Sequence, residues 1–103
     1  MWILQSLTDE TPRPLTFRLP PGTVRTIGRA KRADFIVDAA MVSRLHCRLT
    51  ASLDGPLVVE DLGSTNGTFV NDLRVKNSPL VPGDRLRVGR VEMVVSEASQ
   101  ADQ

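Results

Sequence analysis

Six side chains that could bind an anion lie in three short segments of this sequence. The segments span residues 28–29, 43–46 and 61–71. The six side chains are those of Arg29, Ser43, Arg44, Ser64, Thr65 and Asn66. Arginine offers a planar fork of donors that stays charged, and hydroxyls and loop N–H groups can complete a shell of donors around an anion. This mixture favours a dianionic phosphate, such as a phosphothreonine side chain with about −1.5 to −2 charges and three acceptor oxygens.

Two other kinds of chemistry are possible for the residues around His46. As a general base for Ser43, with Asp61 as its orienting partner, His46 would make the protein a hydrolase. However, the three-residue spacing does not by itself aim Ser43 at the imidazole, and the sequence has no Gly-x-Ser-x-Gly elbow. Cys47 has no second cysteine or histidine with which to complete a zinc site. We therefore expect no catalytic residue, metal or cofactor, and we expect Cys47 to be a buried thiol.

The segments between these polar residues alternate with a period of two. Residues 15–19 and 85–88 alternate between apolar and polar side chains, as half-buried strands do. The other predicted strands span residues 2–7, 24–27, 34–37, 45–49, 57–60, 68–70, 73–75 and 91–95. Turn signals at 20–22, 71–72 and 82–84 separate them. No stretch of ten or more residues forms a convincing amphipathic helix, so the pattern predicts an all-β sandwich or barrel.

Composition limits the possible function classes. With 103 residues, 41% hydrophobic and 24% charged, the chain suits one globular domain. The net charge of +1 gives no overall argument for a nucleic-acid or membrane partner. The positive charge is nevertheless concentrated in residues 25–48, which carry six arginines and lysines against two aspartates. Such a local excess can steer an anion toward the surface.

Several features bear on location and boundaries. No apolar run approaches the ~20 residues of a membrane span, and no basic region precedes the apolar N-terminal residues, as it would in a signal peptide. The single cysteine excludes an internal disulfide. We therefore expect a cytoplasmic protein. The small polar residues from Ser96 onward are expected to fray, and we assign residues 1–97 to the domain and 98–103 to a flexible tail or the start of a linker.

The order of these segments resembles the forkhead-associated (FHA) domain family. The matching pieces are Gly-Arg at 28–29, Ser-x-x-His at 43–46, Asp-Leu-x-Ser-x-Asn-Gly-Thr-Phe-Val-Asn at 61–71 and Leu-x-x-Gly-Asp at 80–84. Each piece is common by itself, but all of them in this order are specific, and the resemblance covers about residues 15–95. It implies an FHA-type β-sandwich of two antiparallel or mixed sheets with about eleven short strands. It also implies that loops at one end bind a phosphothreonine peptide.

The resemblance assigns a role to each matching residue. Arg29 and Ser43 would bind the phosphate directly, and Thr65 would make a contact at or near it. Asn66 would hold the peptide backbone beside the phosphothreonine, and Arg44 would be a second cation on the phosphate side. Three further residues would support the site without touching phosphate: Gly28, His46 and Gly67.

The expected function is therefore a phosphothreonine-peptide-binding module and not an enzyme. Its partners would be proteins phosphorylated by Ser/Thr kinases, the kinase itself, or other domains of a longer parent chain. An alternative is a phosphate-independent scaffold or oligomerisation domain with the same fold. Nucleic-acid binding through residues 25–48 is disfavoured, because the segment lacks interleaved aromatic residues and a recognition helix.

Overall fold

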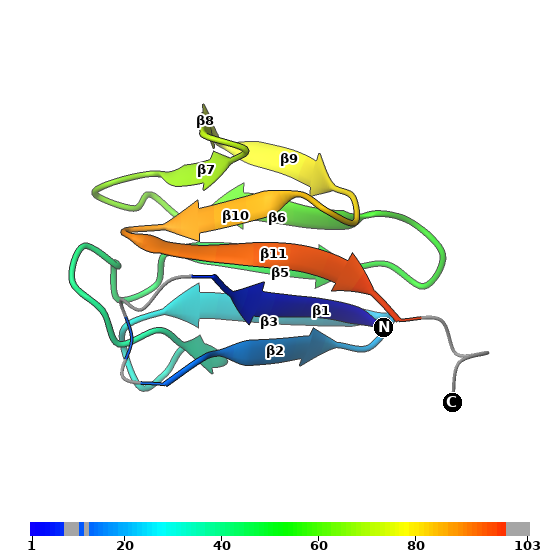
Figure 1. Ribbon diagram of the computed structural model, residues 1–103, viewed down its shortest axis with the longest axis horizontal. Coiled ribbons are helices and arrows are strands. Elements are labelled where there is room, and N and C mark those ends of the chain that lie inside the picture. The colour runs from blue at the N-terminus through cyan, green and yellow to red at the C-terminus, as the bar shows by residue number, and fades with distance from the viewer. Residues whose placement is uncertain (8–10, 12, 99–103) are drawn as a thin grey trace.

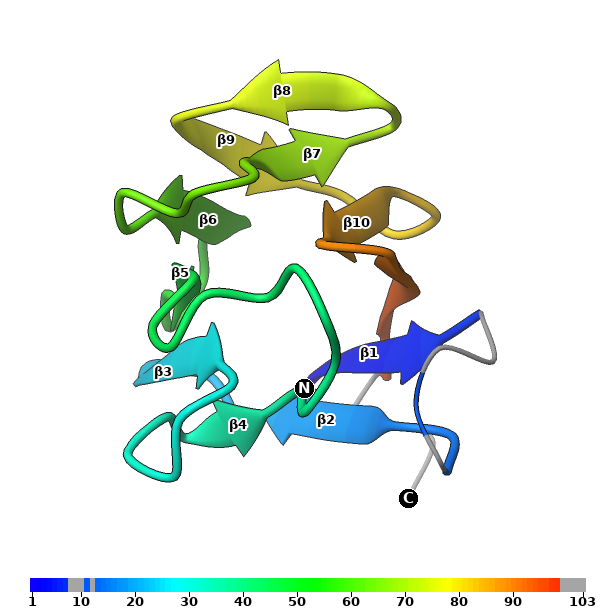
Figure 2. The ribbon, with the colours of Figure 1, turned by 90° about the vertical axis from the view of Figure 1, so that its left-hand side faces the viewer.

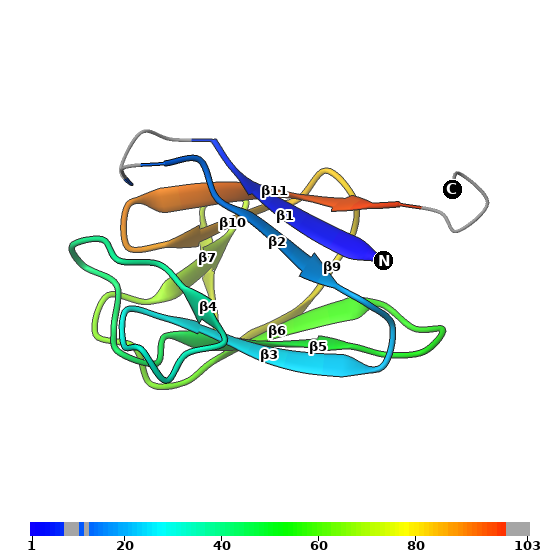
Figure 3. The same ribbon diagram turned by 90° about the horizontal axis from the view of Figure 1, so that it is seen from below.

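The protein folds into two β-sheets that pack face to face (Figures 1 and 3). The computed structural model describes residues 1–7, 11 and 13–98, and these residues form eleven strands and no helix. The strands are β1 (Trp2–Ser6), β2 (Thr16–Leu19), β3 (Thr23–Gly28), β4 (Phe35–Ile36), β5 (Cys47–Ala51), β6 (Leu57–Asp61), β7 (Thr68–Val70), β8 (Leu73–Val75), β9 (Asn77–Leu80), β10 (Arg85–Val88) and β11 (Val91–Glu97). This architecture confirms the predicted all-β sandwich. No helix in the described ranges has the length and apolarity that crossing a membrane requires.

The two sheets differ in size and in strand direction. The six-stranded sheet has the order β2-β1-β11-β10-β7-β8, and the five-stranded sheet has the order β4-β3-β5-β6-β9. β3 and β4 pair in parallel, and the other strand pairs are antiparallel. The five-stranded sheet is therefore mixed, as the resemblance implied.

The core lies between the sheets and follows from the alternation of the strands. In β11, Val91, Met93 and Val95 point inward and are fully buried, and Leu86 and Val88 of the neighbouring β10 join them. In the facing sheet, β5 and β6 contribute most of the buried side chains. These are Cys47, Leu49, Ala51, Leu57 and Val59, all fully or almost fully buried. The shared face predicted for Val91, Met93 and Val95 is confirmed.

Several features of the strands differ from the sequence-based prediction. β5 begins two residues later than the predicted strand 45–49, and β4 covers only part of the predicted strand 34–37. β9 is absent from the predicted strands. It contains Pro79, and proline removes a ladder donor. The strand tolerates Pro79 because β9 is an edge strand that pairs only with β6. Ser96 and Glu97 were expected to fray, but they continue β11 and pair with Ile3 and Trp2 of β1. Of the predicted tail 98–103, residues 99–103 lie outside the described residues.

The loops that carry the three polar segments gather at one end of the sandwich. The connections β3–β4, β4–β5 and β6–β7 lie at the left of Figure 1, and this end faces the viewer in Figure 2. The antiparallel order β3-β5-β6 accounts for this arrangement, because β3 and β6 end at the same end of the sheet at which β5 begins.

Candidate functional site

Backbone hydrogen bonds join the β3–β4 loop to the β4–β5 loop. The N–H of Arg29 donates to the carbonyl of Ser43 at 2.9 Å, and the N–H of Ala30 donates to the carbonyl of Arg44 at 3.1 Å. The two chains approach so closely that a β-carbon on Gly28 would overlap the Arg44 carbonyl and lie 2.9 Å from the Cα of Leu45. Only glycine fits at position 28, and this close contact fixes where the Arg29 side chain leaves the backbone.

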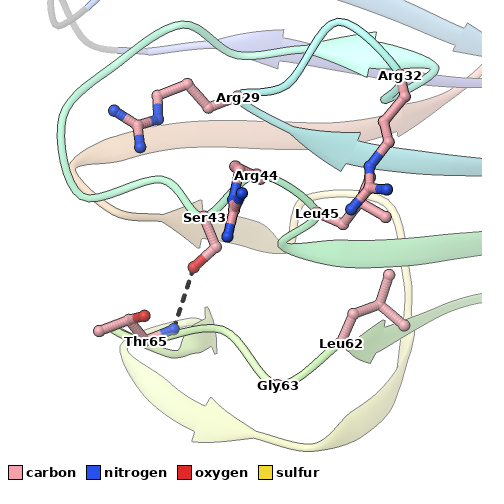
Figure 4. Close-up of a pocket in the computed structure, with 8 residues that line it drawn as sticks. All are labelled: Arg29, Arg32, Ser43, Arg44, Leu45, Leu62, Gly63 and Thr65. Atoms are coloured by element: carbon pink, nitrogen blue, oxygen red, sulfur yellow. Dashed lines mark hydrogen bonds between the residues drawn. The ribbon is translucent and has the colours of Figure 1, made fainter.

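Two further hydrogen bonds join the β4–β5 loop to the β6–β7 loop. The N–H of Thr65 donates to Ser43 Oγ at 3.1 Å, and Asn66 Nδ2 donates to the Met41 carbonyl at 3.0 Å (Figure 4 shows the first bond). Because Ser43 Oγ accepts this bond, its own proton remains available for an anionic acceptor. Met41 has a φ of 71°, a left-handed conformation that is uncommon for a residue other than glycine.

His46 connects the same two loops from inside the protein. The side chain is fully buried. Its Nδ1 accepts the N–H of Ser43 at 3.1 Å, so the hydrogen of the neutral ring lies on Nε2, which donates to the Gly67 carbonyl at 2.8 Å. Both ring nitrogens are therefore occupied, and neither contacts the Ser43 hydroxyl. This arrangement lacks the serine–histidine contact that a hydrolase would use.

Asp61 organises the first turn of the β6–β7 loop. Its Oδ1 accepts the hydroxyls of Ser64 at 2.5 Å and Thr68 at 2.7 Å, and its Oδ2 accepts the N–H groups of Gly63 and Ser64, both at 3.1 Å. Burial by itself raises the pKa of Asp61, but these hydrogen bonds outweigh burial and hold the pKa below its ordinary value of 3.8. Ser64 Oγ in turn accepts the N–H of Gly67. Ser64 thus links Asp61 to Gly67, the residue whose carbonyl accepts the His46 hydrogen bond.

Two adjoining hollows open between the three loops. The larger has a volume of about 600 Å³ (Figure 4), and the smaller has a volume of about 200 Å³. The larger is lined by Arg29, Arg32, Ser43, Arg44, Leu45, Leu62, Gly63 and Thr65. The smaller is lined by Arg29, Met41, Val42, Ser43, Thr65 and Asn66. The structure thus brings together all five side chains that the sequence suggested for phosphopeptide binding.

The site has an excess of positive charge. Arg29 and Arg44 are exposed, and within residues 1–7, 11 and 13–98 neither lies within 4.0 Å of a carboxylate oxygen. Arg32 also lines the larger hollow, although it belongs to none of the motifs in the sequence. The only signal for Arg32 was its place in the basic segment 25–48, which does not distinguish it from its neighbours. The free guanidinium groups of Arg29 and Arg44 can bind a multiply charged anion.

Cys47 lies behind this site and takes no part in its surface. The thiol is fully buried at the start of β5. Burial raises its pKa to about 12, and the negative charge of Asp61 contributes to the increase. No group of three or more potential metal ligands occurs among the described side chains.

Comparison with known proteins gives the family. The model of the FHA domain matches residues 25–89, which is more than half of the chain. This chain belongs to the FHA domain family. The matched region contains all three loops of the site, and the family consists of interaction modules.

Individual relatives agree with this assignment. The chain is 39% identical, over 90 residues, to the ABC transporter ATP-binding/permease protein Rv1747 of Mycobacterium tuberculosis, and the match covers 87% of this chain and 10% of the transporter. A solved FhaA FHA domain, complexed with the intracellular domain of Rv3910, is 35% identical with a TM-score of 0.79. That match covers 92% of this chain and 99% of the other. An FHA domain solved for phosphothreonine-dependent interactions is 33% identical with a TM-score of 0.79, over 95% and 97% of the two chains.

The curated relatives are longer than this chain. The chain spans between 10% and 52% of the length of the first two curated relatives that it matches. The match therefore concerns one domain of those proteins.

Proposed function

We propose that this domain binds phosphothreonine-containing peptides and thereby docks proteins that a Ser/Thr kinase has phosphorylated, or the kinase itself. The observation that carries the proposal is the common hollow of Arg29, Ser43 and Thr65, which come from three different loops. Arg29 and Ser43 bind the phosphate, Arg44 and Thr65 add contacts on its flanks, and Asn66 holds the peptide backbone.

The energetics support this assignment. A hydrogen bond to a charged group contributes about 1.5–3 kcal/mol, so two or three of them supply much of the ~8 kcal/mol that micromolar affinity requires. The bonds between the loops also matter, because loops that are already joined lose less conformational freedom when the peptide binds. Gly28, His46 and Gly67 act here as supports and not as ligands.

The FHA relatives add independent support. One was solved for phosphothreonine-dependent interactions, and another was solved with an intracellular partner domain. A binding role without catalysis also agrees with the engagement of both His46 ring nitrogens inside the protein. We further propose a cytoplasmic location, which suits a single buried cysteine with no disulfide partner.

The test compares a threonine peptide with and without its phosphate, bound to wild type and to Arg29→Ala. Loss of a charge-assisted contact predicts at least about a tenfold weaker affinity of Arg29→Ala for the phosphorylated peptide. Arg18→Ala is the matched control, because Arg18 is an exposed arginine on β2 that lines neither hollow. It should bind like wild type.

The two ways in which this test can fail have different meanings. If wild type binds both peptides equally, the domain is a phosphate-independent scaffold. If wild type requires the phosphate but Arg29→Ala binds normally, the ligand is right and the assignment of the site is wrong.

A further inference from the structure

Arg32 occupies a distinct part of the binding end. It is an exposed residue of the β3–β4 loop, three positions after Arg29. In Figure 4, the Arg32 and Arg44 side chains extend toward the segment that carries Leu62 and Gly63, whereas Arg29 points in another direction. Arg32 lines the larger hollow only, whereas Arg29 lines both.

The charges around the larger hollow exceed what one phosphothreonine needs. Three guanidinium groups line it, and in the part of the chain that the structure describes no carboxylate lies within 4.0 Å of any of them. A phosphothreonine supplies at most two negative charges. Three like charges around one hollow also repel one another, and the attraction of a further anion would offset this repulsion.

The residues that line the two hollows also indicate room for a second anion. Both include Arg29, Ser43 and Thr65, so a phosphate at this shared position contacts both hollows. The remainder of the larger hollow extends away toward Arg32, over the half-buried side chains of Leu45 and Leu62. An apolar floor of this kind lowers the local dielectric and strengthens the attraction between a guanidinium and an anion above it.

We propose that Arg32, beside Arg44 in the larger hollow, forms a second anion subsite for a negatively charged side chain of the same peptide. This proposal rests on the proposed function, because the phosphothreonine anchors the peptide. The anion is either an acidic residue or a second phosphorylated residue, since both present the oxygens that a guanidinium binds. An extended peptide advances about 7 Å over two residues, so a side chain two or three positions from the phosphothreonine can reach a neighbouring subsite.

The experiment uses fluorescence anisotropy with a set of phosphothreonine peptides. The reference peptide has only neutral residues around the phosphothreonine. In one series an aspartate moves from three positions before the phosphothreonine to three positions after it, and in a second series a phosphoserine does the same. Each peptide is measured with wild type, Arg32→Gln and Lys31→Gln. Lys31→Gln is the matched control, because Lys31 is an exposed neighbour in the same loop that does not line the hollow.

At one or two positions the second anion should tighten binding to wild type by about two- to fivefold, the upper part of the range for an exposed ion pair. Arg32→Gln should lose this gain and still bind the reference peptide within about twofold of wild type, whereas Lys31→Gln should keep it. The gain should also shrink in 0.5 M salt, because exposed charges are screened. The series that shows the larger gain identifies whether the second anion is a carboxylate or a phosphate.

Three results overturn the proposal. One is the absence of a gain at every position in both series. Another is an equal gain in Arg32→Gln and wild type, and the third is an equal loss in Arg32→Gln and Lys31→Gln, which would indicate only general attraction. If the reference peptide does not bind wild type at all, the proposed function has failed instead, so the two failures are distinguishable.

Discussion

Replacing Asp61 with asparagine should destabilise the domain, although Asp61 lines neither of the two hollows at the binding end. The carboxylate accepts four hydrogen bonds, two from hydroxyls and two from backbone N–H groups. Asparagine keeps the shape but offers one oxygen and one NH₂ group. If the NH₂ group faces the N–H groups of Gly63 and Ser64, two donors oppose each other. If it faces the hydroxyls of Ser64 and Thr68, both hydroxyls must stop donating there.

The size of the effect follows from this count. Two of the four donors lose their acceptor, and each costs about 1–3 kcal/mol where water cannot replace it. Asp61 is partly exposed, while Thr68 is fully buried, so we expect a value near the lower end for each bond. Asp61→Asn should therefore reduce the free energy of unfolding by about 2–3 kcal/mol, a large share of the 5–15 kcal/mol of a typical domain.

Urea unfolding measures this loss. Trp2 is the only tryptophan and is buried, so its fluorescence reports global unfolding. Asp54→Asn is the control, because Asp54 is exposed in the β5–β6 turn and the substitution changes the charge in the same way. It should change stability by less than about 0.5 kcal/mol. Equal midpoints for Asp61→Asn and Asp54→Asn would refute the reasoning.

The difference between wild type and Asp61→Asn should also depend on pH. The folded protein holds the pKa of Asp61 below 3.8, so the unfolded chain binds more protons just below that value. The contribution of Asp61 is then fully present above the unfolded pKa and is lost as pH falls through the folded pKa. The free energies of unfolding of wild type and Asp61→Asn should differ by a constant amount above about pH 5, and the difference should shrink below about pH 4. A constant difference down to pH 3 would contradict this cause.

Two further predictions concern residues close to the binding loops. Gly28→Ala should destabilise the domain by at least about 2 kcal/mol, because the added β-carbon overlaps the Arg44 carbonyl. In the same urea titration Gly55→Ala should cost less than about 1 kcal/mol, because its β-carbon meets only the Ser52 side chain. Equal costs for the two variants would mean that the loops can move apart freely. Cys47, with a pKa raised to about 12, should react with a disulfide reagent at pH 8 more than about a hundredfold more slowly in the native protein than in urea, and rapid native labelling would show that the thiol is accessible.

The strands could be predicted where the alternation of apolar and polar residues was clear. The prediction failed where a single residue obscured that alternation. The alternation of β11 places Val91, Met93 and Val95 in the core, because a strand that covers a core on one face has no other way to bury them. β9 escaped prediction because the ladder geometry that makes Pro79 tolerable depends on which strands lie at the edge. Edge position is a property of the whole sheet and leaves no local signal.

The site was predictable to a different degree. The resemblance selected the residues that line the hollows, such as Arg29 and Asn66, because they recur in ordered motifs. It did not select Arg32, since the position of a loop side chain follows from tertiary contacts and not from a period in the sequence. It also did not indicate that Asn66 donates to the Met41 carbonyl, because a backbone acceptor looks the same at every residue.

The contrast between exposed and buried members of the site has a physical reason. A guanidinium such as that of Arg29 must remain hydrated until an anion arrives, because an unpaired buried charge would cost several kcal/mol. The groups that hold the loops together work best when they are dry, since water then cannot compete for their hydrogen bonds. His46 and Thr68 are accordingly buried, while Arg29, Arg32 and Arg44 are exposed. The binding end can thus carry a concentrated positive charge without destabilising the sandwich that positions it.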